Sequence, residues 1–188
     1  MTMRFPFLLK RDAQAKLNYA TADDFRKLFT EDMASLYLLA FLLTGSHENA
    51  ESCFVSGIED CAESSSVFRE WARSWARRVI IQNAVRMISP RPGFQGPITH
   101  GFLSTAAPRE QRQNQDAVWA GVLALDHFER FVFVVSVLEG YDDRECAVLL
   151  GSTVLEVGHT RMQALQHVAD FGMTNVQPVN EISRMAVA

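Results

Sequence analysis

The chain of 188 residues has only three cysteines, and they lack the spacing that metal sites and disulfide frameworks need. Cys53, Cys61 and Cys146 are an odd number and include no CxxC pair, which argues against both kinds of site. The five histidines are scattered, and none has an acidic or thiol partner at ligand spacing. The sequence therefore predicts no metal site and no cofactor.

Long apolar runs are also lacking. The densest, Leu36 to Leu43, is interrupted by Tyr37 and is far shorter than the roughly 18 residues that cross a bilayer. The first ten residues are too short for a signal peptide and contain no small-residue cleavage site. We therefore expect a cytoplasmic protein with no membrane partner.

The motifs of common enzyme classes are missing as well. The sequence contains no Ser-His-Asp order with an elbow motif, no phosphate-binding loop and no paired carboxylate site. Glu59, Asp60 and Glu63 lie at a spacing typical of a solvated helix face. We expect no catalytic residues and no enzymatic activity.

The composition that is present is that of a globular protein, with 48% hydrophobic and 21% charged residues. Residues 89–112 contain prolines and glycines without periodicity, which is typical of a linker. Helical periodicity appears on both sides of it. The sequence predicts an all-α fold of two small lobes, a three-helix bundle at 20–88 and a helix-turn-helix lobe at 113–172.

Three helices are expected in the first lobe. Asp23 or Asp24 can cap a helix whose apolar residues recur at helical spacing as far as Phe41, and the residues Thr44, Gly45 and Ser46 would end it. A second helix is predicted from Ser46 or His47 to about Ala62. A third is predicted from Val67 to Ile88.

The second lobe is expected to open with a helix over 116–125. The apolar residues 131–138 resemble a buried strand, but no second strand exists to pair with them, so a fully buried helix is predicted. Asp142 and Glu145 form a capping-box pattern before a short helix that ends at Gly151. Ser152 or Thr153 would cap a last helix to about Phe171, which completes a helix-turn-helix pattern.

Charge is segregated along the chain. Residues 31–67 contain seven acidic residues and no Lys or Arg, whereas residues 69–91 contain six arginines and one acid. On the predicted third helix, Arg69, Arg73 and Arg77 form a row that can neutralise phosphates, and neighbouring aromatic residues can stack on unpaired bases. Two other interpretations stay open: Phe68, Trp71, Trp75 and Val79 form a core face, and the arginines pair with the acidic second helix.

Four motifs, taken in order, resemble a known family. Residues 68–79 resemble the promoter-melting helix of extracytoplasmic-function (ECF) sigma factors, in which a Phe and a Trp three apart precede an Ala-Arg pair. Residues 42–51 are similar to the family's leucine–glycine turn and Asp-Ala-Glu helix start. Residues 139–141 and 145–151 resemble its second helix-turn-helix lobe. The likeness covers roughly Phe25 to Ala169, and we interpret the chain as a divergent member.

The resemblance implies a transcription initiation factor whose partners are core RNA polymerase, promoter DNA and an anti-sigma protein. It assigns binding of the polymerase clamp to Glu51, Ser52, Val55 and Ser56. It assigns melting of the minus-ten promoter element to Arg69, Trp71, Arg73, Trp75, Arg77 and Arg78. It assigns contact with the minus-thirty-five element to Thr153, His159, Thr160, Arg161 and Gln163.

Two stretches depart from the family pattern. The clamp helix of the family is rich in Asp, Gln and Glu, and its recognition helix is rich in Lys and Arg; here residues 154–168 contain one arginine, Arg161. Either Arg161 or Met162 fits the position of the family's usual leucine. From Pro92 onward the sequence contains six arginines and eleven acidic residues, so the net negative charge of this lobe would repel the phosphates of DNA. The alternative is a sigma-like module that binds a protein regulator without initiating transcription.

Overall fold

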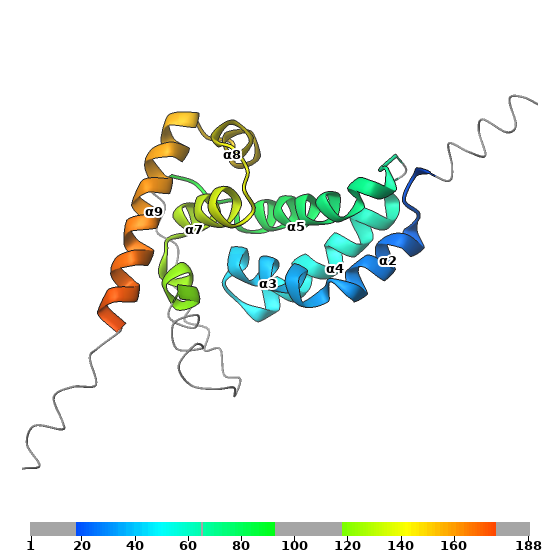
Figure 1. Ribbon diagram of the computed structural model, residues 1–188, viewed down its shortest axis with the longest axis horizontal. Coiled ribbons are helices and arrows are strands. Elements are labelled where there is room, and N and C mark those ends of the chain that lie inside the picture. The colour runs from blue at the N-terminus through cyan, green and yellow to red at the C-terminus, as the bar shows by residue number, and fades with distance from the viewer. Residues whose placement is uncertain (1–17, 65, 93–117, 176–188) are drawn as a thin grey trace, which may run out of the picture. The chain divides into compact units, whose positions relative to one another are not determined.

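The computed structural model describes residues 18–64, 66–92 and 118–175, and the fold of these residues is all-α, as predicted (Figure 1). Their one β pairing is an isolated bridge between Tyr19 and Phe68. The chain divides into two compact units, Met1–Ser89 and Pro90–Ala188. Most of the predicted linker and the first residues of the predicted second lobe lie outside the described residues. No helix among the described residues is long and apolar enough to span a bilayer.

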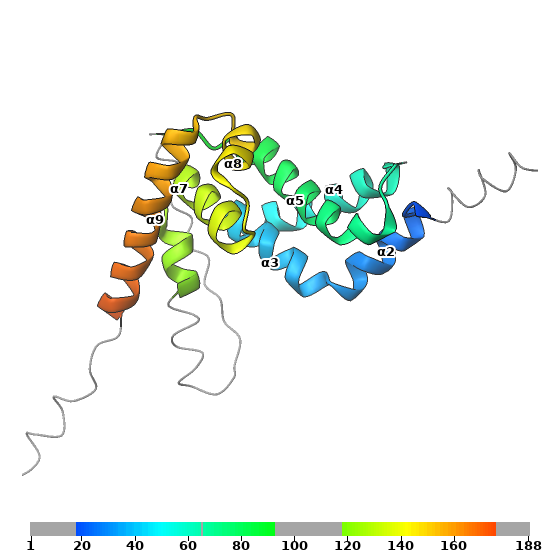
Figure 2. The ribbon, with the colours of Figure 1, turned by 45° about the horizontal axis from the view of Figure 1, so that its top comes forward.

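The first unit contains α2 (Ala22–Glu31), α3 (Met33–Thr44), α4 (His47–Glu63), the 3-10 turn η1 (Arg69–Trp71) and α5 (Ala72–Ile88) (Figures 1 and 2). The single first helix predicted from the sequence is wrong, because the chain changes direction at Asp32. Asp32 donates its backbone N–H to Leu28 and accepts from Leu36, so hydrogen bonding continues across the bend. Residues 25–41 keep one apolar periodicity because both helices face the same core.

The cap of α2 also differs from the prediction. Thr21, rather than Asp23 or Asp24, is the N-cap residue, and its hydroxyl accepts from the backbone N–H of Asp24 at 3.2 Å. The Asp24 carboxylate in turn accepts from the backbone N–H of Thr21 at 2.8 Å. This reciprocal pair is a capping box, and it satisfies two backbone donors that the start of a helix leaves without partners.

The other predicted ends of the first two helices are confirmed. Gly45 has a φ of 74°, the left-handed conformation that ends α3 and that glycine adopts without steric cost. Ser46 caps α4, its hydroxyl accepting from the backbone N–H of Asn49 at 3.2 Å. The turn between α3 and α4 is thereby fixed, and α4 packs against α2, α3 and α5.

Gly57 lets α4 pack closely against α5. A β-carbon placed there would lie 2.6 Å from Cδ1 of Ile80, a side chain that is completely buried. The two helices are also joined at their polar edge, where the Asp60 carboxylate accepts from Asn83 at 3.0 Å and from Arg86 at 2.8 Å. Because α5 is held along its length, the residues at its start are presented in a fixed direction.

The second unit contains a helix over residues 118–124, α7 (His127–Val132), the π-helix η2 (Phe133–Leu138), α8 (Asp143–Leu150) and α9 (Val154–Asn175). The prediction of a helix over 131–138 is confirmed, but it passes from α to π geometry, and its last two residues are about 40% exposed. Phe131 to Val135 are all buried and form the centre of this unit's core.

The helix-turn-helix pattern is confirmed locally. The Asp142 carboxylate accepts from the backbone N–H groups of Arg144 and Glu145 at 2.9 and 2.8 Å, and Glu145 completes the predicted capping box. Gly151 is left-handed, with a φ of 63°. Thr153 caps α9 through Glu156, and α9 continues to Asn175 rather than ending near Phe171. One glycine inside a helix, Gly172, costs only about 1 kcal/mol and does not end it.

Candidate nucleic-acid interface

The start of α5 carries a small aromatic cluster, which we define as Tyr19, Phe68 and Trp71. Backbone pairing brings Tyr19 to Phe68, because the N–H of Ala20 donates to the carbonyl of Val67 at 2.7 Å. The rings of Tyr19 and Phe68 stack with centroids 4.7 Å apart, and Trp71 meets Phe68 edge-on at 5.2 Å. Trp71 is nevertheless 58% exposed. The cluster supports a large flat side chain at the surface instead of burying it.

The exposure of Trp71 corrects one interpretation of the sequence, in which Phe68, Trp71, Trp75 and Val79 share a core face. Residues 69–71 form a 3-10 turn, in which successive side chains are about 120° apart instead of the 100° of an α-helix. Trp71 is the N-cap residue of α5 and stands just outside the helix that carries Trp75 and Val79. Val79 is buried, and Trp75 is half-buried with its indole N–H donating to the hydroxyl of Ser64 at 3.2 Å.

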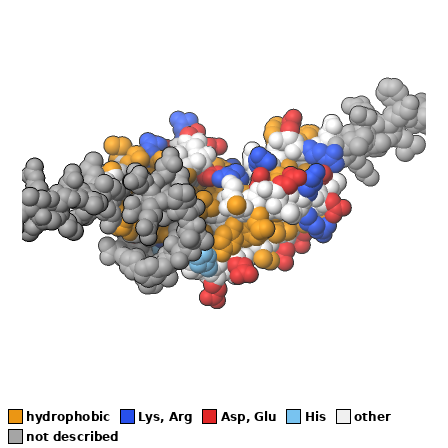
Figure 3. All heavy atoms as spheres, turned by 60° about the horizontal axis from the view of Figure 1, so that its bottom comes forward, with side chains coloured by type: hydrophobic (Ala, Val, Ile, Leu, Met, Phe, Trp, Pro, Cys, Tyr) orange, Lys and Arg blue, Asp and Glu red, His pale blue; other side chains and the backbone are white. Residues whose placement is uncertain are grey.

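The predicted arginine row is present on the exposed side of α5 and η1. Arg69 pairs with Asp24 at 3.0 Å and Arg73 pairs with Asp32 at 2.8 Å, while Arg77 donates to the hydroxyl of Ser35 at 2.9 Å. The carboxylate partners of Arg69 and Arg73 thus lie in or next to α2, so for these two arginines the expected pairing with the acidic second helix is wrong. Arg78 is half-buried. In Figure 3, blue cations and red carboxylates intermix on this unit.

These ion pairs are weak enough to exchange. The side chains of Arg69 and Arg73 remain 50% and 67% exposed, and exposed pairs contribute roughly 0–1 kcal/mol. Hydrogen bonds from the backbone and hydroxyl of Thr21, helped by Arg69, lower the pKa of Asp24, so this carboxylate is ionised at neutral pH. A nucleic-acid phosphate offers the arginines a similar partner and releases counterions when it binds.

The residues assigned to the polymerase clamp lie on one exposed stripe of α4. Glu51, Ser52 and Val55 are exposed, and Val55 is 48% exposed. Ser56 is half-buried and lies at the edge of this stripe. Glu48 and Glu59 extend the stripe at helical spacing, and both are exposed. The stripe is therefore an acidic surface with one apolar residue near its middle, which suits a basic partner.

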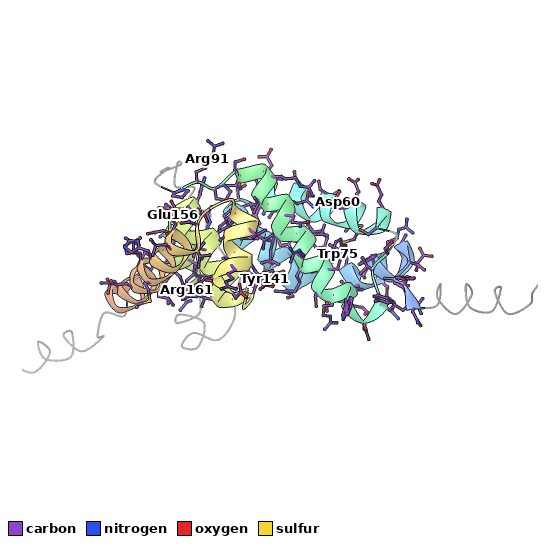
Figure 4. The ribbon with its side chains drawn as sticks, turned by 90° about the horizontal axis from the view of Figure 1, so that it is seen from above. Asp60, Trp75, Arg91, Tyr141, Glu156 and Arg161 are labelled. Atoms are coloured by element: carbon purple, nitrogen blue, oxygen red, sulfur yellow. The ribbon has the colours of Figure 1, made fainter. Side chains whose placement is uncertain are left out.

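The structure separates the residues assigned to the minus-thirty-five element. Thr160 is 8% exposed and packs into the unit, so it is not available for contact. Arg161 forms an ion pair with Asp143 of α8, and Thr153 is occupied in capping α9. His159 and Gln163 are exposed. The buried positions are Val157, Thr160 and Ala164, so neither Arg161 nor Met162 occupies a core position. Arg161 is labelled on α9 in Figure 4.

Sequence reasoning missed several residues that shape both surfaces. Tyr19 joins the aromatic cluster through a bridge to a residue 49 positions away, and no local pattern signals such a pairing. The sequence offers Asp24 as a helix cap and places Asp32 inside one long helix, so it predicts neither as the partner of a particular arginine. On α9 Leu155 is 83% exposed, and this apolar side chain supplies no phosphate contact.

The described residues give little support for a metal site or a reactive cysteine. No group of three or more His, Cys, Asp or Glu side chains in this part of the chain is arranged to hold a metal ion. Burial raises the pKa of Cys53 to about 11, of Cys61 to about 12 and of Cys146 to about 11. These thiols remain protonated at neutral pH and act as small core residues.

The chain was also compared with known proteins. No protein-family model matches it, and no curated protein matches it.

Proposed function

We propose that this chain is a transcription initiation factor of the kind that ECF sigma factors represent, which binds core RNA polymerase in the cytoplasm and acts on promoter DNA. The observation that carries the proposal is the exposed Trp71, which rests on Phe68 and lies between the exposed arginines Arg69 and Arg73 in sequence. An aromatic face beside cations is the arrangement that binds an unpaired base and its flanking phosphates.

The acidic stripe of α4 supplies the second part of the proposal. Glu48, Glu51 and Glu59 surround Val55 on an exposed face that the unit itself leaves open. Such a face binds a basic helix or groove, and in this proposal its partner is the polymerase clamp. Binding to polymerase and opening of DNA are then carried by two different helices of one unit.

Trp71→Ala is the variant that tests the proposal most directly. We expect DNA opening in transcription with core polymerase and genomic DNA from the same source to fall by roughly 5- to 150-fold, because stacking contributes roughly 1–3 kcal/mol per base. Binding of labelled protein to core polymerase should not change. Met87→Ala, which removes another exposed apolar side chain of α5, is the matched control. Unchanged DNA opening by Trp71→Ala would refute the assignment.

The arginine row has its own signature. Replacing Arg69, Arg73 and Arg77 with alanine should weaken binding to single-stranded DNA and lower the salt slope by about 0.7 for each phosphate contact that is lost. Folding should change little, since two of the removed contacts are exposed ion pairs. A salt slope identical to that of the unmodified protein would show that the row makes no phosphate contact.

A second candidate function is favoured by one observation, the lack of available cations on α9. In this alternative the chain keeps the fold and binds a protein regulator without initiating transcription. Titration of labelled protein against purified core polymerase separates the two. Saturable binding supports the initiation factor, and absence of binding by the folded protein supports the interaction module.

A further inference from the structure

The outer face of α9 carries an apolar stripe that the second unit does not cover. We define it as Leu155, Met162 and Leu165, which are 83%, 64% and 40% exposed. Leu155 and Met162 are seven residues apart, and Leu165 follows three residues later, so the three side chains lie along one side of the helix. Residues at this spacing form the seam of a helix pair.

A second stripe of residues on the same helix is buried and packs against the core of the unit. Val157, Thr160 and Ala164 are buried against the rest of the unit, and α9 packs on α7, α8 and η2 through this side. Apolar residues of a surface helix normally lie on its buried face only. The stripe of Leu155, Met162 and Leu165 is thus additional to what the fold requires.

Duplex DNA is a poor occupant of this face. Arg161 is held by Asp143 of the neighbouring helix, and Glu156 lies exposed beside Leu155. Phosphates would therefore meet exposed Leu and Met side chains and a carboxylate rather than cations.

A second copy of the chain is also disfavoured by charge. Residues 118–171 contain eight acidic residues and three arginines. Of these arginines, Arg130 is 4% exposed and Arg161 is paired internally. Two such surfaces placed face to face would repel each other, whereas a cationic partner would be attracted.

We propose that the stripe of Leu155, Met162 and Leu165 binds an amphipathic helix of a partner protein, with leucine-like residues in its seam and Lys or Arg on its flanks. The seam of the partner would cover the three apolar side chains. Its cations would face Glu156 near the start of α9 and Asp170 farther along, both of which are exposed. Met162 adds an unbranched side chain that adapts to a partner's surface.

The test uses two synthetic peptides of about three heptads, each with Leu at the seam positions. One carries Lys at the flanking positions and the other carries Glu. Each is labelled and titrated with the full chain, and binding is followed by fluorescence anisotropy. We expect the Lys peptide to bind at least tenfold more tightly than the Glu peptide, and this preference should shrink as salt is raised.

The site is located by the double variant Leu155→Glu with Met162→Glu, which should weaken binding of the Lys peptide at least tenfold. Met33→Glu is the matched control, because it places a carboxylate at another exposed apolar position, in the first unit. Thermal unfolding of each variant verifies that the fold is retained. Equal binding of the two peptides, or binding unaffected by the double variant, would overturn the proposal. The assay contains neither polymerase nor DNA, so its failure leaves the proposed initiation function untouched.

Discussion

The start of α5 in the first unit and the outer face of α9 in the second are the two surfaces that the resemblance assigns to DNA, and their chemistry differs. On α5 and η1, Arg69 and Arg73 are paired but half or more exposed, and the exposed Trp71 lies between them in sequence. On α9 the one arginine is held by Asp143, and the exposed side chains include Leu155 and Met162. The exposed surfaces of the two helices therefore favour different kinds of partner.

The exposure of an arginine also affects how much free energy is needed to separate it from its carboxylate partner. The cost of leaving the carboxylate is small for Arg69 and Arg73 because these arginine side chains are 50% and 67% exposed. Their partners Asp24 and Asp32 are 34% and 22% exposed. The side chains of Arg161 and Asp143 are only 35% and 27% exposed, so separating them costs more. The same residue type is available to a ligand in one unit and structural in the other.

The largest expected effect tests whether the two regions are independent. Phe25 and Phe131 are fully buried in the first and second units, and truncating either to alanine should cost about 3–5 kcal/mol of unfolding free energy. Hydrogen exchange should show the loss confined to the unit that carries the change. Met33→Ala, at an exposed position, should stay within about 0.5 kcal/mol. Equal loss of protection in both units would mean that they unfold together.

A middle-sized effect compares the capping boxes of the two units. Thr21→Ala removes the cap of α2, and Asp142→Ala removes the cap of α8. Each should lower the unfolding free energy by about 1 kcal/mol, because backbone donors lose their acceptor. Denaturant titration measures the loss, and Thr21→Ser and Asp142→Asn, which retain a capping oxygen, should recover most of it. If the alanine variants matched the unmodified protein, the caps would contribute nothing.

The smallest expected effect is a pH dependence shared by the two units. Hydrogen bonds from Thr21 lower the pKa of Asp24 below 3.8, and hydrogen bonds from Thr153 lower the pKa of Glu156 below 4.5. A carboxyl whose pKa is lower in the folded state stabilises the fold above its ordinary pKa. That stability is lost as the pH falls through the folded value, so unfolding should become easier below about pH 4. NMR titration of the two carboxyl groups measures both pKa values, and ordinary values would contradict the assignment.

Local signals in the sequence were sufficient for much of the fold. Gly45, Ser46, Asp142 and Gly151 end or cap helices where the sequence placed these events, because each acts through its own backbone or nearest neighbours. The bend at Asp32 was missed because both α2 and α3 bury the same apolar face. Periodicity alone does not register a change of direction that preserves that face.

The candidate sites were less predictable than the fold, for physical reasons. The positions of Arg69, Arg73 and Arg77 on one side were visible from their spacing, but their partners in α2 and α3 depend on tertiary packing. Trp71 is exposed and lies in a 3-10 turn that no residue type signals. The exposure of Leu155 and Met162 required knowing which side of α9 the core occupies.

The π-helix η2 has a consequence for sequence comparison. In η2 the backbone N–H of Glu139 donates to the carbonyl of Val134, five residues back rather than four, so the hydrogen-bonded loop contains one residue more than in an α-helix. An insertion of one residue fits in such a turn without lengthening any loop. A family pattern that lacks this residue would therefore align everything after η2 one position out of step, even where the helices superimpose.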